Sequence, residues 1–392
     1  MVVFCYRIRG VLRAVTPLHI GSGARTGVIK HCYPFIPGAV LRGAVGVSLM
    51  RSVCKLDRPL VQHESCQYFG NCLYAQLFGE EFGKSSKVFF RYAYPLHLKC
   101  GGLFRPAAKT LHKCSNPQCG RIYEVFVSPA VCESCGEHGV IKPLRGFRCD
   151  SCGYFERVPV RISRMTLTAV DRTLCSAAQV PAATGEKAGT IHTLEVIQSG
   201  SVFGFEIIVH EDLADAVDVL KSVLVRALPD EGIGGSKSRG LGKVAVEDLR
   251  VDEVDTSVLE GRAEGIDVER FRVRLVSPMI LDGKYLDESS LLEGARRAYS
   301  WAFHKGKPSL PEVRLVNYAL DDEVYGGWSL KAERKREIKT AISPGSVFDF
   351  TCEFKSLDLA LSLAALEYYA VGSYKPHGCG QIIVVQGAEV VG

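Results

Sequence analysis

Six cysteines between residues 100 and 160 have the spacing of metal ligands. They form three pairs, with four residues inside the first pair and two inside each of the others. The pairs are Cys114 and Cys119, Cys132 and Cys135, and Cys149 and Cys152. A glycine follows each pair, and such turns let thiolates surround a tetrahedral ion. Twelve and thirteen residues separate successive pairs, as in zinc ribbons. We therefore predict a zinc-binding insertion at 100–160.

The number of thiolates leaves the ligand sets open. Six is too many for one zinc ion and too few for two sites of four cysteines each. Either one pair binds nothing, or a second ion recruits His112, His138 or Cys100. Four protein ligands leave no open coordination position, so we expect the zinc to have a structural role.

A glycine-rich loop at residues 232–243, with the sequence GIGGSKSRGLGK, is the second chemical signal. Glycines let a backbone approach a ligand closely, and consecutive exposed amides can bind an anion. The predicted ligand-binding residues of this loop are Gly234, Gly235, Ser236, Lys237, Ser238, Arg239, Gly240 and Gly242. A dinucleotide-binding turn would follow a strand and open a helix, whereas here a helix precedes the loop and a strand follows it. The alternative is a hairpin that only closes a sheet.

The N-terminal segment is basic without any acid. Residues 1–56 contain eight lysines and arginines and no aspartate or glutamate. A surface of one sign attracts polyanions, although the acidic partners can also lie elsewhere in the fold. A helix is predicted from Gly38, directly after Pro37, so its N-terminal amides could face a phosphate. Arg42, on the second turn of that helix, would then reach the same phosphate.

The elements that must position these residues occur twice in the same order. The first half contains an alternating strand from residue 3, a helix at 38–53, a strand at 201–209, a helix near 212–228 and the glycine-rich loop. The second half contains a strand from 271, helices at 287–303 and 356–370, a strand at 346–354 and a glycine loop at 372–380. This order predicts an α+β fold of two ferredoxin-like, RRM-type domains. We expect domains at 1–250 and 268–392, with 251–267 as an acidic, polar linker.

Bulk composition indicates an ordinary globular protein, with 47% hydrophobic and 23% charged residues. No run of eighteen apolar residues occurs, and the N-terminus does not resemble a signal peptide. We expect a cytoplasmic protein.

Taken together, these motifs resemble the RAMP superfamily of CRISPR–Cas proteins. The similar segments are Pro17–Gly23, Pro34–Gly43, Leu77–Gly79, Val88–Pro95 and the loop 232–242. The stretch from Val170 through Glu195 to Phe203 also resembles type III subunits. Two RAMP units with a cysteine-rich insertion are most similar to the Cas-five-like subunit of type III-D effector complexes.

The resemblance implies a role in antiviral defence. It implies that the chain binds the 5′ handle of crRNA and contacts the large polymerase-like subunit and the backbone RAMP subunits. Gly21, Arg25, Gly38 and Arg42 would then join the glycine-rich loop in the RNA site. Related backbone subunits cut RNA with an aspartate between the His-Ile-Gly and Ile-Pro-Gly motifs. That interval has no acid here, so no catalytic residue is expected.

Two alternatives remain. The first is a crRNA-processing or target-cleaving endoribonuclease that uses a histidine for acid–base chemistry, with His19, His31 and His63 available. The second is a zinc-dependent scaffold that docks a partner protein and binds no RNA.

Overall fold

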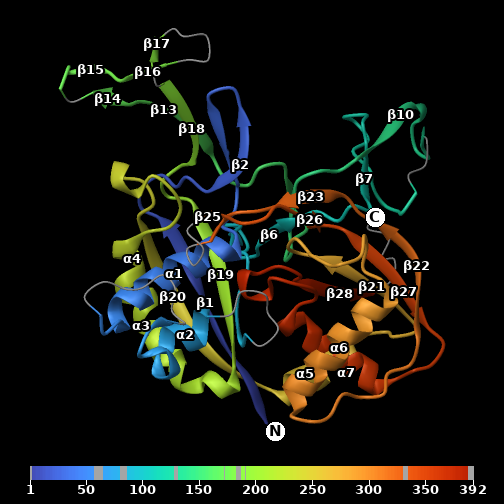
Figure 1. Cartoon of the computed structure of the whole chain (residues 1–392). Coiled ribbons are helices and arrows are strands. Elements are labelled where there is room, and N and C mark those ends of the chain that lie inside the picture. The colour runs from blue at the N-terminus through green and yellow to red at the C-terminus, as the bar shows by residue number, and fades with distance from the viewer. Residues whose placement is uncertain are drawn as a thin grey trace.

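The computed structural model describes most of the chain, and the structural statements below concern these ranges: 2–56, 65–79, 86–127, 131–171, 173–181, 187–189, 191–329 and 334–386. His63 lies outside them. Two antiparallel sheets, each with helices packed on one face, form the body of the molecule (Figure 1). No helix in the described part of the chain is long and apolar enough to cross a membrane.

The first sheet has the strand order β20-β1-β19-β4, and β5 pairs with β19. Its strands are β1 (Val3–Ala14), β4 (Val88–Phe90), β5 (Tyr94–Pro95), β19 (Val202–His210) and β20 (Val244–Asp255). Its helices are α1 (Gly38–Val53), α2 (Leu73–Phe78), α3 (Val217–Ser222) and α4 (Leu228–Glu231). Alternation along β1 sends Ile8 and Leu12 into a core with Leu41 and Leu224, while Arg7 and Arg9 lie on the other face. The helix predicted near 212–228 is divided, because 3-10 and π turns flank α3.

The second sheet repeats this topology, with the order β22-β27-β21-β28. Its strands are β21 (Arg270–Leu275), β22 (Val313–Ala319), β27 (Val347–Cys352) and β28 (Ile382–Gln386), and its helices are α6 (Glu288–Phe303) and α7 (Leu357–Tyr369). Side chains of Asp287 and Ser356 accept hydrogen bonds from backbone amides at the starts of α6 and α7. Each sheet places its first strand beside its third and fourth, as ferredoxin-like units do. The predicted α+β fold with two such units is confirmed.

The segment 251–267, predicted as a linker between the halves, is folded. It contains the end of β20 and helix α5 (Thr256–Glu264), whose residues Leu259 and Ala263 are buried in the same core as α7. Arg262 donates two hydrogen bonds, of 2.9 and 3.0 Å, to the carboxylate of Glu367 on α7. The acidic, polar composition concealed this helix because only one narrow side of it is apolar.

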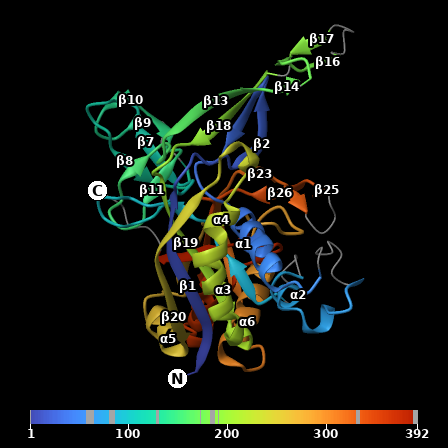
Figure 2. The same ribbon diagram turned by 90° about the vertical axis from the view of Figure 1, so that its left-hand side faces the viewer.

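Two extensions lie at the same end of the body, away from α5 and α6 (Figures 1 and 2). One is an arm whose sheet has the order β13-β18-β3-β2. Its strands are β2 (Gly21–Thr26), β3 (Ile29–Cys32), β13 (Ile162–Thr168) and β18 (Ile191–Ile197), with β14 (Val170–Asp171), β15 (Ser176–Ala177), β16 (Gln179–Pro181) and β17 (Lys187–Gly189) toward its tip.

The other extension is the cysteine-rich insertion. Its strands are β6 (Phe104–Pro106), β7 (Leu111–Cys114), β8 (Ile122–Glu124), β9 (Val131–Cys132), β10 (Gly136–Pro143), β11 (Phe147–Cys149) and β12 (Phe155–Glu156). Four further short strands belong to the second half: β23 (Asp322–Tyr325), β24 (Trp328–Ser329), β25 (Arg334–Lys335) and β26 (Lys339–Ile342).

Candidate functional site

The first two cysteine pairs form one compact group. The four sulfur atoms of Cys114, Cys119, Cys132 and Cys135 all lie within 4.8 Å of one another. Two of the separations are 3.7 Å, between Cys119 and Cys132, and 4.0 Å, between Cys114 and Cys135. Bonds of about 2.3 Å from zinc to each thiolate place the sulfurs of a tetrahedral site about 3.8 Å apart. The observed spacing fits this geometry.

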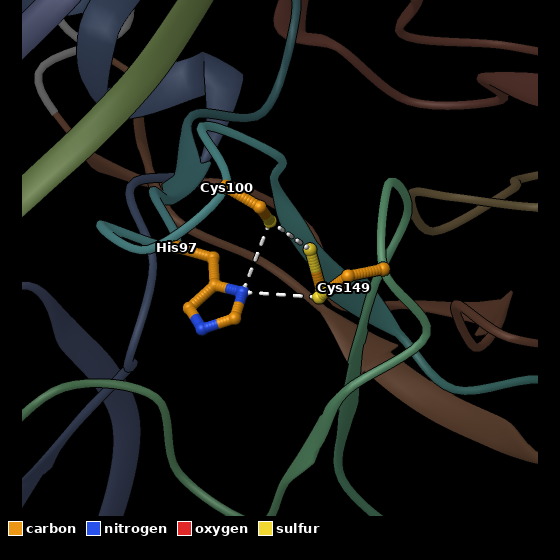
Figure 3. A group of neighbouring side chains, drawn as sticks. His97, Cys100 and Cys149 are labelled. Atoms are coloured by element: carbon orange, nitrogen blue, oxygen red, sulfur yellow. Dashed lines mark hydrogen bonds between the residues drawn. The ribbon is translucent and has the colours of Figure 1, made fainter.

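The third cysteine pair belongs to a second group of four, with His97 and Cys100. Its donor atoms also lie within 4.8 Å of one another. The ring Nδ1 of His97 is 3.2 Å from the sulfur of Cys100 and 3.3 Å from that of Cys152. The side chains of His97, Cys100 and Cys149 point toward a common centre (Figure 3). The set of three thiolates and one imidazole fits a tetrahedral metal site.

The structure shows which candidate ligands lie together. All three cysteine pairs lie in groups of four candidate ligands, and the third pair is joined by Cys100, which one of the alternatives named, and by His97. His112 belongs to neither group, and its Nδ1 lies 3.0 Å from the backbone oxygen of Thr110. The side chain of His138 lies outside the described residues. His97 was missed, although His97-Leu-Lys-Cys100-Gly has the same spacing and following glycine as the cysteine pairs.

Two glycines leave room for the metal ligands. A Cβ at Gly139 would lie 2.7 Å from Cβ of Cys132 and 2.9 Å from the sulfur of Cys114. A Cβ at Gly102 would lie 2.7 Å from the sulfur of Cys149. Each group therefore depends on one close glycine outside its own turns.

In each group the hydrogen bonds favour ionisation of one thiol, that of Cys132 or Cys149, while the pKa values of Cys100, Cys114 and Cys135 are raised. A hydrogen bond from the Tyr123 hydroxyl lowers the pKa of Cys132 to about 6. Burial raises the pKa of Cys149, but the backbone amides of Cys152 and Ser151 outweigh it and lower the value to about 7. A thiolate is the form that binds a metal ion.

The glycine-rich loop is held by backbone hydrogen bonds to the segment that follows β1. The amides of Gly235 and Gly242 donate to the carbonyls of His19 and Pro17, at 2.9 and 3.0 Å. Gly234 has a φ of 86° and passes so close to His19 that a Cβ would lie 2.6 Å from its carbonyl oxygen. These glycines are therefore required by the packing of the loop itself. The residues left exposed at the tip of the loop are Lys237, Ser238, Arg239 and Gly240.

The glycine loop of the second half repeats these contacts atom for atom. The amides of Ser373 and Gly380 donate to the carbonyls of Ile280 and Pro278, at 2.9 and 2.7 Å. The left-handed φ of Ser236, 60°, is matched by 57° at Tyr374. The difference is burial, since Lys375, Pro376 and His377 are buried against the start of α1, whereas the first loop faces outward.

That packing contradicts the predicted phosphate role of the α1 N-terminus. A Cβ at Gly38 would lie 2.0 Å from the carbonyl oxygen of Phe90 and 2.6 Å from that of His377, so the second loop covers the helix start. Arg42 is 7% exposed, donates a 2.8 Å hydrogen bond to the carbonyl of Phe78 and lies over its ring. Both residues have structural roles, because the second half occupies the space that a phosphate would need.

Half of the eight basic N-terminal residues, Arg7, Arg9, Arg13 and Arg51, have acidic partners elsewhere in the fold, as the alternative interpretation required. Arg9 lies 2.8 Å from Asp252, and Arg13 lies 2.7 Å from Glu247. The predicted residues Gly21 and Arg25 lie exposed on β2 of the arm. Within the described part of the chain, Arg25 has no ion-pair partner.

The exposed loop also has neighbours in its own half. Lys237 forms an ion pair with Glu231 at the end of α4. The guanidinium of Arg239 lies 2.9 Å from Nε2 of His192 on β18, so the loop and the arm form one continuous surface.

The interval between the His-Ile-Gly and Ile-Pro-Gly motifs contains no acid in the sequence, but a distant strand brings a carboxylate beside it. Glu195 on β18 reaches the acid-free interval between the two motifs, with 3.0 Å between its Oε2 and Nδ1 of His31. The other ring nitrogen of His31 is 2.8 Å from the hydroxyl of Thr26. His19 is mostly buried, and its Nδ1 is 2.7 Å from the backbone oxygen of Glu195. Burial of Glu195 raises its pKa, but hydrogen bonds from His31 and the amide of Cys32 give a net lowering.

Comparison with known proteins identifies related chains. A model of the RAMP superfamily matches residues 11–245. The CRISPR system Cms endoribonuclease Csm3 of Methanothermobacter thermautotrophicus is 41% identical over 71 residues. That match covers 18% of this chain and only 29% of the length of the relative.

Two solved structures are also similar. A Cas6 product complex aligns over 98% of this chain and 100% of its own, with 10% identity and a TM-score of 0.40. The type III-B Cmr-beta complex bound to cognate target RNA aligns over 64% of this chain and 61% of the matched chain, with 14% identity and a TM-score of 0.31.

Proposed function

This chain belongs to the RAMP superfamily, and we propose on that premise that it is a non-catalytic RNA-binding subunit of a type III CRISPR effector complex. Its task is to hold the 5′ handle of crRNA in antiviral defence. The superfamily match spans the arm and the first glycine-rich loop, and the partial relative Csm3 is named as part of a CRISPR system. Within the superfamily, the two-unit chain with an insertion corresponds to the Cas-five-like subunit of type III-D complexes.

One observation carries the proposal. The molecule contains two glycine loops of the same backbone geometry, and only the first keeps its tip exposed. That tip presents Lys237, Ser238 and Arg239, beside the exposed Arg25-bearing arm. A single-stranded RNA can be held there through its phosphates by guanidinium, ammonium and hydroxyl groups.

The test is handle-RNA binding by a Lys237→Ala/Arg239→Ala variant. Loss of about two phosphate contacts should lower the slope of log affinity against log salt by roughly 1.4. We expect affinity at low salt to fall roughly tenfold. Arg314→Ala/Lys355→Ala removes two exposed cations from the second half and serves as the control. Unchanged affinity and slope in the loop variant would refute the proposal.

The second candidate function is endoribonucleolytic, and the Thr26–His31–Glu195 arrangement favours it. A carboxylate that orients an imidazole can make it a general base for a ribose hydroxyl. Incubation of the protein with repeat RNA in excess chelator tests this. Cleavage that is lost in His31→Ala and kept in His192→Ala would favour the enzyme over the non-catalytic subunit.

The metal of both four-ligand groups is proposed to be zinc. Sets of four thiolates, or three thiolates and one imidazole, in tetrahedral spacing are those of structural zinc sites. The bound ions would hold the insertion together and supply no reaction chemistry. Elemental analysis should find two zinc ions per chain, and Cys132→Ser should leave one. A full complement in that variant would contradict the ligand assignment.

The proposed partners are crRNA, the large polymerase-like subunit and the backbone RAMP subunits. We propose domains at 1–250 and 268–392, joined at 251–267 by the end of β20 and helix α5 rather than by a flexible linker.

A further inference from the structure

Strand β20 forms one edge of the first sheet, where it pairs with β1 (Figures 1 and 2). It is 12 residues long. Between Ala245 and Val254, its backbone forms no hydrogen bond to any described residue outside β1. An edge strand of this length offers a row of unpaired N–H and C=O groups to which a further strand can add.

The other edges of the two body sheets are short or already satisfied. Strands β4 and β5 have 3 and 2 residues. On β22, the amide of Leu315 donates to the carboxylate of Glu288 at 2.9 Å. On β28, the amide of Val384 donates to the carboxylate of Glu367 at 2.7 Å, and its carbonyl accepts from Arg262. Among the described edges of the body, β20 alone leaves a long run of backbone groups without partners.

The hydrogen bonds of β1 show which groups of β20 point outward. The amide of Ala14 donates toward β19, and the amide of Val15 donates toward β20. Odd-numbered residues of β1 therefore bond to β20, and their register partners Arg250 and Asp252 point inward. The residues between and after these direct their N–H and C=O groups away from the sheet, and they are Val251 and Glu253.

A bulge limits this edge to its second half. Asp248 has a φ of 50°, and the register with β1 shifts between Glu247 and Arg250. Bulges twist an edge strand and interrupt further pairing. The register from Arg250 to Val254 is regular. This segment has the usual length of a protein strand, about five residues.

The side chains along this segment define the partner that it fits. Val251 is partly buried against the core of the first half, on the side of the helices. Arg250 is exposed on the opposite face and has no ion-pair partner among the described residues. Its register partner Arg9 is also a cation and already has Asp252 at 2.8 Å. An added strand therefore gains most from an apolar residue beside Val251 and a carboxylate beside Arg250.

We propose that the second half of β20 is a docking edge for an extended strand of a partner protein, in which apolar and acidic residues alternate. Main-chain hydrogen bonds to Val251 and Glu253 supply the affinity, and Arg250 supplies selectivity. A polypeptide has alternating amides and carbonyls at the spacing of this edge, which a nucleic acid lacks. The inference goes beyond the proposed function and shares no residue with the glycine-rich loop.

The experiment follows amide hydrogen exchange over residues 249–255 in the full-length chain alone and in the complex isolated with its partners from the host. Unpaired amides at a sheet edge exchange rapidly, whereas paired amides are protected. We expect the amides of Val251 and Glu253 to exchange roughly a hundredfold more slowly in the complex. The amides of Leu315 and Val384 should change little, because they already have intramolecular acceptors.

Two substitutions at one exposed position separate pairing from folding. Glu253→Pro removes an outward amide, and Glu253→Thr keeps it. Proline is tolerated on an edge strand where the missing amide faces solvent, so both variants should fold with similar melting temperatures. Recovery of the partner should fall roughly tenfold with proline and stay unchanged with threonine. If the proline variant does not fold, Arg250→Glu takes its place, because it repels an acidic strand and should lower recovery likewise.

Each remaining outcome contradicts the docking edge. Equal exchange of β20 in the two states, or equal partner recovery with the proline and threonine variants, would overturn it. Protection after addition of handle RNA alone would assign the edge to RNA. Protection of the isolated chain that rises with its concentration would assign the edge to a second copy. Both variants at residue 253 should bind handle RNA as the parent does, so these results leave the test of the glycine-rich loop independent.

Discussion

Arg42 is a charged residue whose partner lies inside the fold. Its guanidinium is buried, donates to the carbonyl of Phe78 and stacks on the ring of the same residue. Sequence alone placed it on the second turn of a helix that was expected to face RNA. Position along a helix does not reveal what covers the helix start, and here the cover comes from Phe90 on β4 and from His377, more than three hundred residues later.

Replacing Arg42 with alanine should therefore lower stability and leave RNA affinity unchanged. The change leaves the Phe78 carbonyl without its donor and removes the stacked side chain, which costs about 2–3 kcal/mol. Urea denaturation measures the free energy of unfolding, and RNA titration under native conditions measures affinity. Lys237→Ala is the matched control, with the opposite pattern. A stable Arg42→Ala protein with weakened RNA binding would contradict the structural role.

His97 shows that a ligand can be visible in the sequence and still be overlooked. A search restricted to cysteine pairs finds six ligands, because His97 and Cys100 form the same two-residue spacing with a different first residue. Glu195 is a different case. It reaches His31 from a strand that lies 164 positions away, and no local pattern indicates such a contact.

At the scale of elements, the two glycine loops differ in how closely other atoms approach the Cβ position of their glycines. Gly380 has a φ of 74°, and a Cβ there would lie 1.7 Å from the carbonyl oxygen of Val371. Gly240 has a φ of 82°, but nothing lies within 4 Å of its Cβ position. The first glycine is required by a backbone contact as well as by its conformation, and the second by its conformation alone.

We therefore expect Gly380→Ala to be far more costly than Gly240→Ala. The exposed position should lose about 1–2 kcal/mol, the cost of a left-handed conformation for an L-residue. The buried position should lose more than about 4 kcal/mol, because a backbone carbonyl cannot move aside. The free energies of unfolding of both variants provide the measurement. Equal losses would show that the second loop does not pack as described.

Strand and helix order was predictable because each half repeats the same periodic pattern. Helix α1 begins and ends at the predicted residues 38 and 53, and α6 begins within one residue of the expected position. The arm strands and α5 were not predicted. Their buried residues, such as Leu194 and Leu259, are few, and their partners come from distant segments. Local periodicity carries no signal for such contacts.

At the scale of the whole molecule, the two halves share one core. Phe4, Phe89 and Ile208 of the first half belong to the same buried cluster as α6 and α7. The hydroxyl of Tyr369 donates to the carbonyl of Phe4 at 3.1 Å. This core holds the halves together, and we expect a single unfolding transition for the body.

That shared core contains a histidine that makes it sensitive to acid. His210, at the end of β19, packs against Trp301 of α6 and Tyr369 of α7. Burial, with smaller contributions from Lys87 and His304, lowers the pKa of His210 to about 4. Its Nδ1 accepts a hydrogen bond from the amide of Asp212, and a backbone hydrogen bond at Trp301 offsets only part of the lowering. The folded protein therefore favours the neutral form of the His210 ring between the two halves.

The pKa of His210 sets the direction of its pH dependence. In the unfolded chain the ring titrates near 6.5, so between that value and about 4 the unfolded state binds the extra proton. Stability from this residue is complete above pH 6.5 and falls as the pH is lowered, by up to about 3 kcal/mol at pH 4. His210→Gln should be less stable at pH 7 but lose less between pH 6.5 and 4.5. Urea denaturation at each pH measures the free energies of unfolding of the two proteins. If both free energies fell equally between pH 6.5 and 4.5, His210 would not be the residue through which acid weakens the contact between the halves.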